Sequence, residues 1–119
     1  MPTQDFVITS SPTLIDQSDR AIVYLAVDWS IPERRSRKAV SAALATLSQL
    51  RFEFFAVSED DEAMRPWLRA HGWPKHELGY GSLMWLEYGR QVAKELFPAH
   101  VGSDAVVAKT RSVWAQPAA

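Results

Sequence analysis

The run Ala21-Ile22-Val23-Tyr24-Leu25-Ala26-Val27 carries no charged side chain and lies between Arg20 and Asp28. A continuous apolar run of this length is typical of a β-strand that is buried on both faces. It is much shorter than the roughly 18–20 apolar residues that a membrane-spanning helix needs. We therefore predict a central strand at Ala21–Asp28, in a sheet that helices cover on both sides.

The segment that follows this strand predicts a long helix from Pro32 to Leu50. Pro32 fits the first turn of a helix, where a missing backbone N–H leaves no hydrogen bond unmade. Val40, Leu44 and Leu47 recur at i, i+4 and i+7, which places them on one side of the helix. We expect this apolar stripe to be buried.

The next segments predict a second buried strand and a shorter helix. The strand is expected at Phe52–Val57, where four of the six residues are large and apolar. Ser58 could cap the helix, with the acidic residues Glu59–Glu62 in its first turn, where the helix dipole favours negative charge. Pro66 predicts that this helix is short, irregular or begins late, and His71-Gly72 predicts its end.

A β-hairpin and a last helix are predicted in the remaining sequence. The two arms of the hairpin are predicted at Ser82–Leu86 and Gln91–Phe97. Tyr88-Gly89 between them is a pair of residues typical of a tight turn. Pro98 is expected to end the second arm. Ser103-Asp104 opens the last helix, which would bury one apolar side.

Together these elements predict a single α/β domain over residues 1–119, with an ordered core at about residues 5–115. A short strand at Asp5–Ser10 and a helical turn at Leu14–Ser18 come before the central strand. The first half alternates strands and helices, which implies parallel crossover connections, and the hairpin adds antiparallel strands. The expected architecture is a three-layer α/β/α sandwich with a mixed central sheet.

This order of elements resembles the thioredoxin-like superfamily over nearly the whole chain, from about Phe6 to Trp114. In Trp29-Ser30-Ile31-Pro32-Glu33, the residues Trp29 and Pro32 match the Trp-Cys-Gly-Pro-Cys motif of thioredoxins, while Ser30 and Glu33 occupy the two cysteine positions. Phe52–Asp60 resembles the third strand of the family, and Leu83–Arg90 resembles its hairpin. The resemblance implies the thioredoxin-like fold.

The residues that support thiol chemistry in the family are replaced here. The chain has no cysteine. The resemblance places Tyr24 where the family has a buried acid, and Gly81 or Ser82 where it has a cis-proline. Thiol–disulfide exchange needs an attacking thiolate, so a chain without cysteine cannot carry it out. We therefore expect no oxidoreductase activity and no disulfide.

The candidate site is the former active-site face, which we expect to bind a protein partner or a second copy of the chain. An adaptor, chaperone-like or structural module is what the resemblance implies. An exposed aromatic residue in a loop is a frequent anchor at protein interfaces. The alternative is a small-molecule binder or an enzyme that uses the same cleft with other chemistry, such as a glutathione-type site. The candidate residues are Trp29, Ser30, Ile31, Pro32, Glu33, Trp73, Tyr80 and Gly81.

Other chemistry-bearing residues fit ordinary structural roles better than catalytic ones. The basic cluster Arg34–Lys38 lies in the first turns of the long helix, where cations oppose the helix dipole. We interpret it as a solvated helix face rather than as a contact for an acidic partner. His71, His76 and His100 have no metal-binding spacing. A triad of Ser30, His76 and Asp28 can be drawn, but such sets are common in any chain. We expect no metal and no cofactor.

The charge of the chain argues against a nucleic-acid partner. The formal net charge is −1 and the pI is near 6.3, whereas a dedicated nucleic-acid binder usually shows a basic excess. Met1–Asp5 lacks the basic and apolar segments of a signal peptide. The sequence therefore predicts a cytoplasmic protein with no nucleic-acid partner and no membrane span.

Overall fold

The central strand β1, Ala21–Ala26, is the middle of the molecule. The computed structural model describes residues 8–26, 31–58, 61–73, 82–96 and 98–114. All six residues of β1 are buried, with at most 2% of any of them exposed. The predicted central strand is confirmed, and it ends at Ala26, the last described residue before the next segment.

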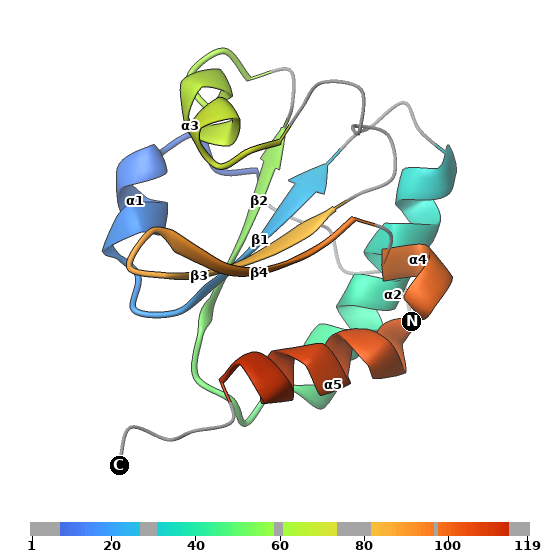
Figure 1. Cartoon of the computed structure of the whole chain (residues 1–119). Coiled ribbons are helices and arrows are strands. Elements are labelled where there is room, and N and C mark those ends of the chain that lie inside the picture. The colour runs from blue at the N-terminus through green and yellow to red at the C-terminus, as the bar shows by residue number, and fades with distance from the viewer. Residues whose placement is uncertain (1–7, 27–30, 59–60, 74–81, 97, 115–119) are drawn as a thin grey trace.

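Four strands form one mixed sheet in the order β2-β1-β3-β4 (Figure 1). β2, Glu53–Ser58, runs parallel to β1, with Tyr24 beside Ala56. β3, Leu83–Glu87, runs antiparallel to β1 on its other side, and β4, Arg90–Glu95, pairs antiparallel with β3. The parallel pair is joined by a helical crossover and the antiparallel pair by a tight turn, as predicted.

Helices cover both faces of the sheet, which makes three layers. On one face lie α1, Pro12–Gln17, and α3, Arg65–Ala70. On the other lie α2, Ile31–Thr46, and α5, Ser103–Val113, with the short α4, Pro98–Val101, against both (Figure 1). The predicted α/β class with a mixed central sheet is confirmed.

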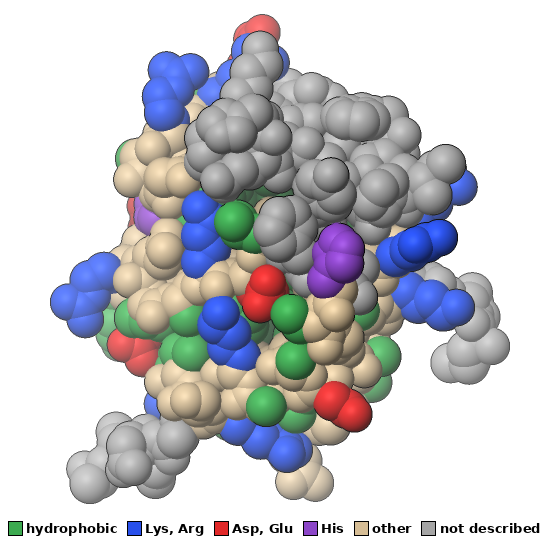
Figure 2. All heavy atoms as spheres, turned by 45° about the vertical axis from the view of Figure 1, so that its right-hand side comes forward, with side chains coloured by type: hydrophobic (Ala, Val, Ile, Leu, Met, Phe, Trp, Pro, Cys, Tyr) green, Lys and Arg blue, Asp and Glu red, His purple; other side chains and the backbone are tan. Residues whose placement is uncertain are grey.

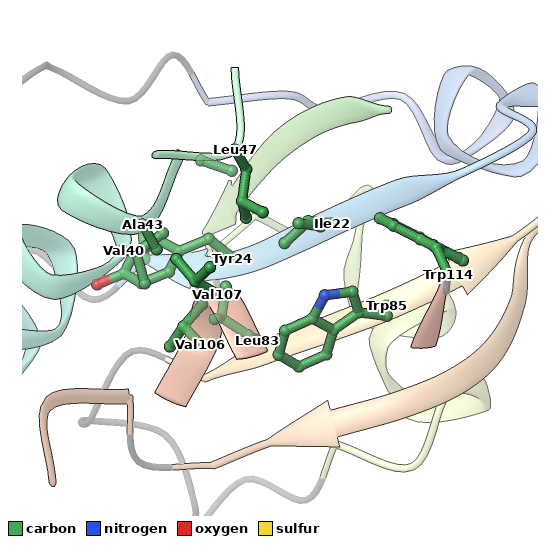
Figure 3. Packing of buried hydrophobic residues seen from close by; sticks show 12 residues of the cluster. Ile22, Tyr24, Val40, Ala43, Leu47, Leu83, Trp85, Val106, Val107 and Trp114 are labelled. Atoms are coloured by element: carbon green, nitrogen blue, oxygen red, sulfur yellow. The ribbon is translucent and has the colours of Figure 1, made fainter. Parts of the chain in front are cut away.

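The two cores are built from alternate residues of the same strands. Ile22 and Tyr24 of β1 point to the α2 and α5 side, where Trp85 of β3 joins them (Figure 3). Val23 and Leu25 point to the α1 and α3 side. Because successive side chains of a strand face opposite ways, an all-apolar strand is required only where both faces are covered.

The helix α2 follows the predicted pattern. Val40, Ala43 and Leu47 are buried with at most 2% exposed, and Leu44 is half-buried beside them. The helix ends at Thr46, four residues earlier than predicted, and a turn carries the chain to β2. The apolar stripe is therefore buried, as expected, and packs on the sheet.

The predicted helix at Ser58 begins late, and the placement of the acidic residues in its first turn is wrong. α3 begins at Arg65 with Pro66 in its first turn. Asp61 lies in a separate turn, where its carboxylate accepts from the Ala63 N–H at 2.9 Å and from the Ser10 hydroxyl at 2.5 Å. A carboxylate that bonds to nearby backbone offers the chain an alternative to the helix.

Two other predicted boundaries also differ. Pro98 does not end the second arm of the hairpin: β4 ends at Glu95, and Pro98 begins α4, where its missing N–H costs nothing. The predicted strand at Asp5–Ser10 lies partly outside the described residues. Its described part makes one parallel bridge, from Ile8 to Ala56, and the Thr9 N–H donates to the Ala56 carbonyl at 2.7 Å.

The edge strand β4 is irregular. Between Trp85 and Leu86 of β3 the pairing shifts, so that Val92 is an extra residue in β4. The Lys109 ammonium of α5 also donates to the Lys94 carbonyl at 2.6 Å. A bulge and a bonded carbonyl thus interrupt the free edge of the sheet.

The turn between β3 and β4 needs positive backbone angles. Tyr88 has φ of 50° and Gly89 has φ of 78°, the pairing that a two-residue hairpin turn favours. A Cβ on Gly89 would lie 2.7 Å from Asp16 Oδ1 and 3.2 Å from the Asp16 Cα. This close approach brings α1 against the hairpin.

Gly89→Ala is expected to destabilise the protein by about 2–4 kcal/mol, since strain at positive φ adds to the clash with Asp16. Gly72→Ala is the matched control, because Gly72 has φ of 76° but open space around its Cβ position. We expect the control to lose only about 1 kcal/mol, the backbone term alone. Urea unfolding of both variants checks this. Equal losses would contradict the clash.

Candidate functional site

The ends of three elements meet at one edge of the sheet. At the carboxyl end of the parallel pair, Ala26 of β1 lies beside Ser58 of β2. The Leu25 N–H donates to the Ser82 carbonyl at 2.9 Å, which brings the residue before β3 to the same place. We call Ala26, Ser58 and Ser82 the site edge. In open α/β sheets, ligands bind at the carboxyl ends of the parallel strands.

The predicted site residues belong to segments that join this site edge. Trp29 and Ser30 follow β1, and Tyr80 and Gly81 precede Ser82; these four lie outside the described residues. Ile31, Pro32 and Glu33 form the first turn of α2, of which the backbone helix alone is described. The sheet fixes the positions of Ala26 and Ser82. The segment with Trp29, which follows Ala26, and the segment with Tyr80, which precedes Ser82, are therefore attached to the sheet at neighbouring points.

Trp73 does not belong to an exposed aromatic surface. Its side chain is only 6% exposed and packs in the core on the α1 and α3 side. Its indole Nε1 has no hydrogen-bond partner there. The position just after α3 explains the burial: the Trp73 N–H donates to the Leu68 carbonyl at 3.1 Å, which folds the chain back over the helix.

Two positions singled out by the family resemblance are buried. Tyr24 is 0% exposed in the middle of β1, on the side of α2. Ser82 is 2% exposed, and its hydroxyl donates to the Leu96 carbonyl at 3.2 Å. Within the described residues no peptide bond is cis. The hydroxyl of Ser82 thus ties the start of β3 to the end of the hairpin.

The first turns of α2 carry an exposed group of cations. Arg34, Arg35 and Lys38 are exposed, and none of these three side chains has an ion pair or hydrogen bond with any other residue of the described part of the chain. Arg37, also in the predicted basic cluster, is half-buried and has a partner. We call Arg34, Arg35 and Lys38 the α2 basic face. Each cation near a helix N-terminus costs about 0.3–1 kcal/mol at low salt.

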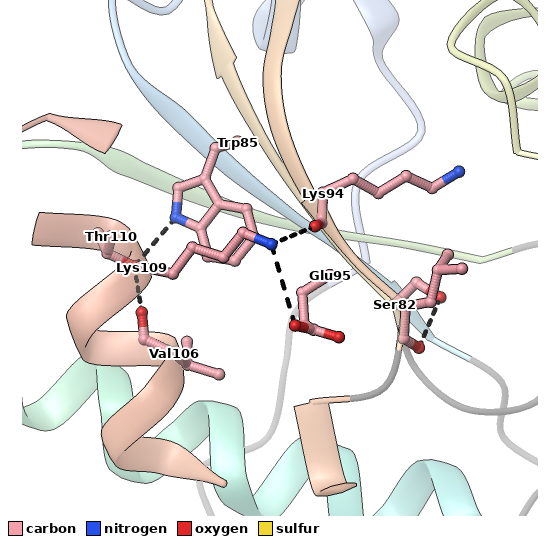
Figure 4. A network of polar contacts seen from close by, with 8 residues as sticks. Ser82, Trp85, Lys94, Glu95, Val106, Lys109 and Thr110 are labelled. Carbon is pink, nitrogen blue, oxygen red and sulfur yellow. Dashed lines mark hydrogen bonds and ion pairs between the residues drawn. The ribbon is translucent and has the colours of Figure 1, made fainter. Parts of the chain in front are cut away.

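A polar network fixes α5 to the hairpin (Figure 4). The Trp85 Nε1–H donates to Thr110 Oγ1 at 3.0 Å, and the Thr110 hydroxyl donates to the Val106 carbonyl at 2.8 Å. Lys109 lies 3.9 Å from Glu95 Oε1, with its ammonium 5.6 Å from the centre of the Trp85 ring. Apolar periodicity alone could not reveal that Thr110 is a buried acceptor.

His71 joins three elements rather than lying free in a loop. Its Nδ1 is 2.8 Å from the Trp67 carbonyl, and its Nε2 is 2.8 Å from the Gly89 carbonyl. The ring stacks on Trp67 at 3.9 Å, and Trp67 Nε1–H donates to Asp16 Oδ1 at 2.9 Å. An imidazole donates to both carbonyls only when both its nitrogens carry a proton. The contacts give His71 a structural role at the end of α3.

Tyr88 and Asp19 interact at the exposed hairpin turn. The negative charge of Asp19 raises the pKa of the Tyr88 phenol above its usual value, and the hydrogen bond to the same carboxylate adds to the effect. Tyr88 is 69% exposed. Both side chains are exposed to solvent, so the pair lacks the buried environment that is typical of catalytic groups.

The described residues hold no metal site. Nowhere in the described ranges do three His, Asp or Glu side chains gather as a metal site would require. A hollow of about 790 Å³ lies near the starts of β1 and β2, lined in part by Arg20, Phe52 and Glu53. No described helix is long and apolar enough to cross a bilayer.

Comparisons of this chain with models of protein families, with curated proteins and with solved structures found no match.

Thr110→Val is expected to destabilise the protein by about 1–3 kcal/mol, because the buried Trp85 Nε1–H loses its acceptor. The substitution keeps the shape of the side chain. Thr46→Val is the control: Thr46 is exposed, and its hydroxyl donates to the Ala42 carbonyl at 3.2 Å. Chemical denaturation should show a change within about 0.5 kcal/mol for the control. A Thr110→Val loss as small as that of the control would refute the role of this bond.

Proposed function

We propose that this chain is a redox-inactive thioredoxin-like domain that binds another protein through the former active-site face, next to the site edge. The contact would use Trp29 and Tyr80, together with the start of α2. The observation that carries the proposal is the meeting of Ala26, Ser58 and Ser82, which attaches the predicted loop segments at neighbouring points. A working surface of this kind needs a rigid scaffold, which the four-stranded sheet provides.

Several features support the thioredoxin-like part of the proposal. A parallel βαβ unit is followed by an antiparallel hairpin and a helix, in one mixed sheet with helices on both faces. The long helix α2 begins five residues after β1, at the place of the family's Trp-Cys-Gly-Pro-Cys motif. Tyr24 is fully buried, as the family's central acid would be. Its phenol ring cannot relay a proton to thiols that the chain does not have.

The absence of cysteine excludes one class of chemistry whatever the fold. Thiol–disulfide exchange requires a thiolate nucleophile, and the chain has none. A protein-binding role needs no such group. The alternative, a small-molecule binder or enzyme in the same cleft, would need polar groups that converge on a hollow at the site edge. The hollow lined by Arg20 and Glu53 lies at the other end of β1 and β2 and so gives that alternative no support.

The native protein should not reduce insulin, since it has no thiol. A double variant, Ser30→Cys with Glu33→Cys, should form an intramolecular disulfide, detected by mass spectrometry as the loss of two hydrogens. Helix starts lower the pKa of cysteine and leave room for the bond. Ala42→Cys with Ala45→Cys has the same spacing on the exposed side of α2 and should oxidise much less readily. Equal oxidation of the two pairs would count against a thioredoxin-like arrangement of Ser30 and Glu33. Insulin reduction by the native chain would contradict the redox-inactive part of the proposal.

Trp29→Ala and Tyr80→Ala should reduce capture of a partner by the immobilised domain. Tyr88→Ala is the matched control, because Tyr88 is an exposed aromatic residue on the hairpin turn, away from the site edge. Loss of one central aromatic anchor commonly costs about 2 kcal/mol, or roughly 30-fold in affinity. Each variant is first checked for unchanged unfolding. If Tyr88→Ala alone abolishes capture, the contact lies on the hairpin and the proposed face is wrong.

A further inference from the structure

The exposed side of α2 has an unusual distribution of charge. From Arg34 to Thr46 the helix contains four cations and no Asp or Glu. Side chains that are three or four residues apart are neighbours on a helix, so a cation there is normally neutralised by an acid at that spacing. No such acid exists within this stretch for Arg34, Arg35 or Lys38. From Arg34 to Thr46 the helix therefore has no acidic side chain to neutralise these cations.

The three cations of the α2 basic face are also neighbours of one another. Lys38 is four residues from Arg34 and three from Arg35, so the three charges share one side of the helix. They repel one another, and Arg34, in the first turn, is also repelled by the positive end of the helix dipole. Both effects are unfavourable in the free protein. A negatively charged partner would relieve both, and this makes the α2 basic face a candidate for contact.

The rest of α2 is suited to close contact. Its other side, with Val40, Ala43 and Leu47, is buried against the sheet. Beyond Lys38, the exposed positions of the helix are Ala42, Ala45 and Thr46, which are small and uncharged. Figure 2, in which the right-hand side of Figure 1 comes forward, shows Lys and Arg side chains at its right-hand margin and also elsewhere on this face. Between Ala42 and Thr46 a partner segment would meet only small, uncharged exposed side chains.

We propose that the α2 basic face binds an acidic segment of a partner protein. The inference rests on the proposed function, because α2 directly follows the proposed contact residues Trp29 and Ser30 in the sequence. An acidic peptide fits better than a nucleic acid: three cations are a small footprint, and the chain as a whole has a net charge of −1. The α2 basic face supplies electrostatic attraction and orientation.

The test uses the full chain and a fluorescein-labelled Glu-rich peptide of about twelve residues, followed by fluorescence polarisation at about 50 mM salt. The variant Arg34→Glu/Arg35→Glu/Lys38→Glu should weaken binding by at least about tenfold. Acidic residues in the first turns of a helix are favourable, so this variant should fold, and circular dichroism verifies it. Raising the salt to about 300 mM should weaken binding to the native chain.

The matched control reverses three other exposed cations, Arg51→Glu/Arg65→Glu/Arg69→Glu, and changes the net charge by the same amount. It should bind the peptide within about threefold of the native chain, as expected of charges outside the contact. Equal weakening by the two triple variants, or no binding to the native chain, would overturn the proposal. The proposal would also be overturned if the native chain bound a single-stranded oligonucleotide more tightly than the peptide and the α2 triple variant abolished that binding. The surface would then be assigned to nucleic acid.

A capture experiment separates this inference from the proposed function. If the α2 triple variant still retains a partner whose capture depends on Trp29, the acidic-segment inference fails and the proposed function stands. If neither Trp29→Ala nor the α2 triple variant changes what is captured, both fail.

Discussion

The burial of β1 on both faces is the constraint on which the rest of the structure depends. Its six residues alternate between two cores, so every one must be apolar and fit its neighbours. A side chain such as Leu25, truncated to alanine in a close-packed core, would cost about 2–5 kcal/mol. One strand thus determines where α2 starts, where β3 pairs and where the site edge forms.

The elements that could be predicted from the sequence are those with a strong local pattern. The uncharged run around Tyr24, the apolar stripe ending at Leu47 and the turn at Gly89 each have one dominant physical interpretation. The late start of α3 could not be predicted in the same way, because Asp61 can favour either a helix or a turn of its own. Its contact with Ser10, fifty-one residues away, decides between them.

Site residues were harder to predict than the fold, because exposure depends on contacts between distant segments. Trp73 lies in a stretch rich in Pro and Gly, which suggests an open loop, yet the chain folds back over α3 and buries it. The charge cluster at the start of α2 was visible in the sequence. The structure adds the distinction between Arg37, which is half-buried with a partner, and the three exposed cations around it.

The irregular edge at β4 bears on how the protein behaves when it is concentrated. A regular exposed strand offers a row of free N–H and C=O groups, on which further chains can stack into fibrils. Here the extra residue Val92 breaks the spacing of those groups, and the Lys109 ammonium donates a hydrogen bond to the Lys94 carbonyl. Charged Arg90 stands at the start of the strand. Fibril growth from this edge is therefore obstructed by geometry and by charge, and the exposed surface of α2 can stay available without inviting aggregation through β4.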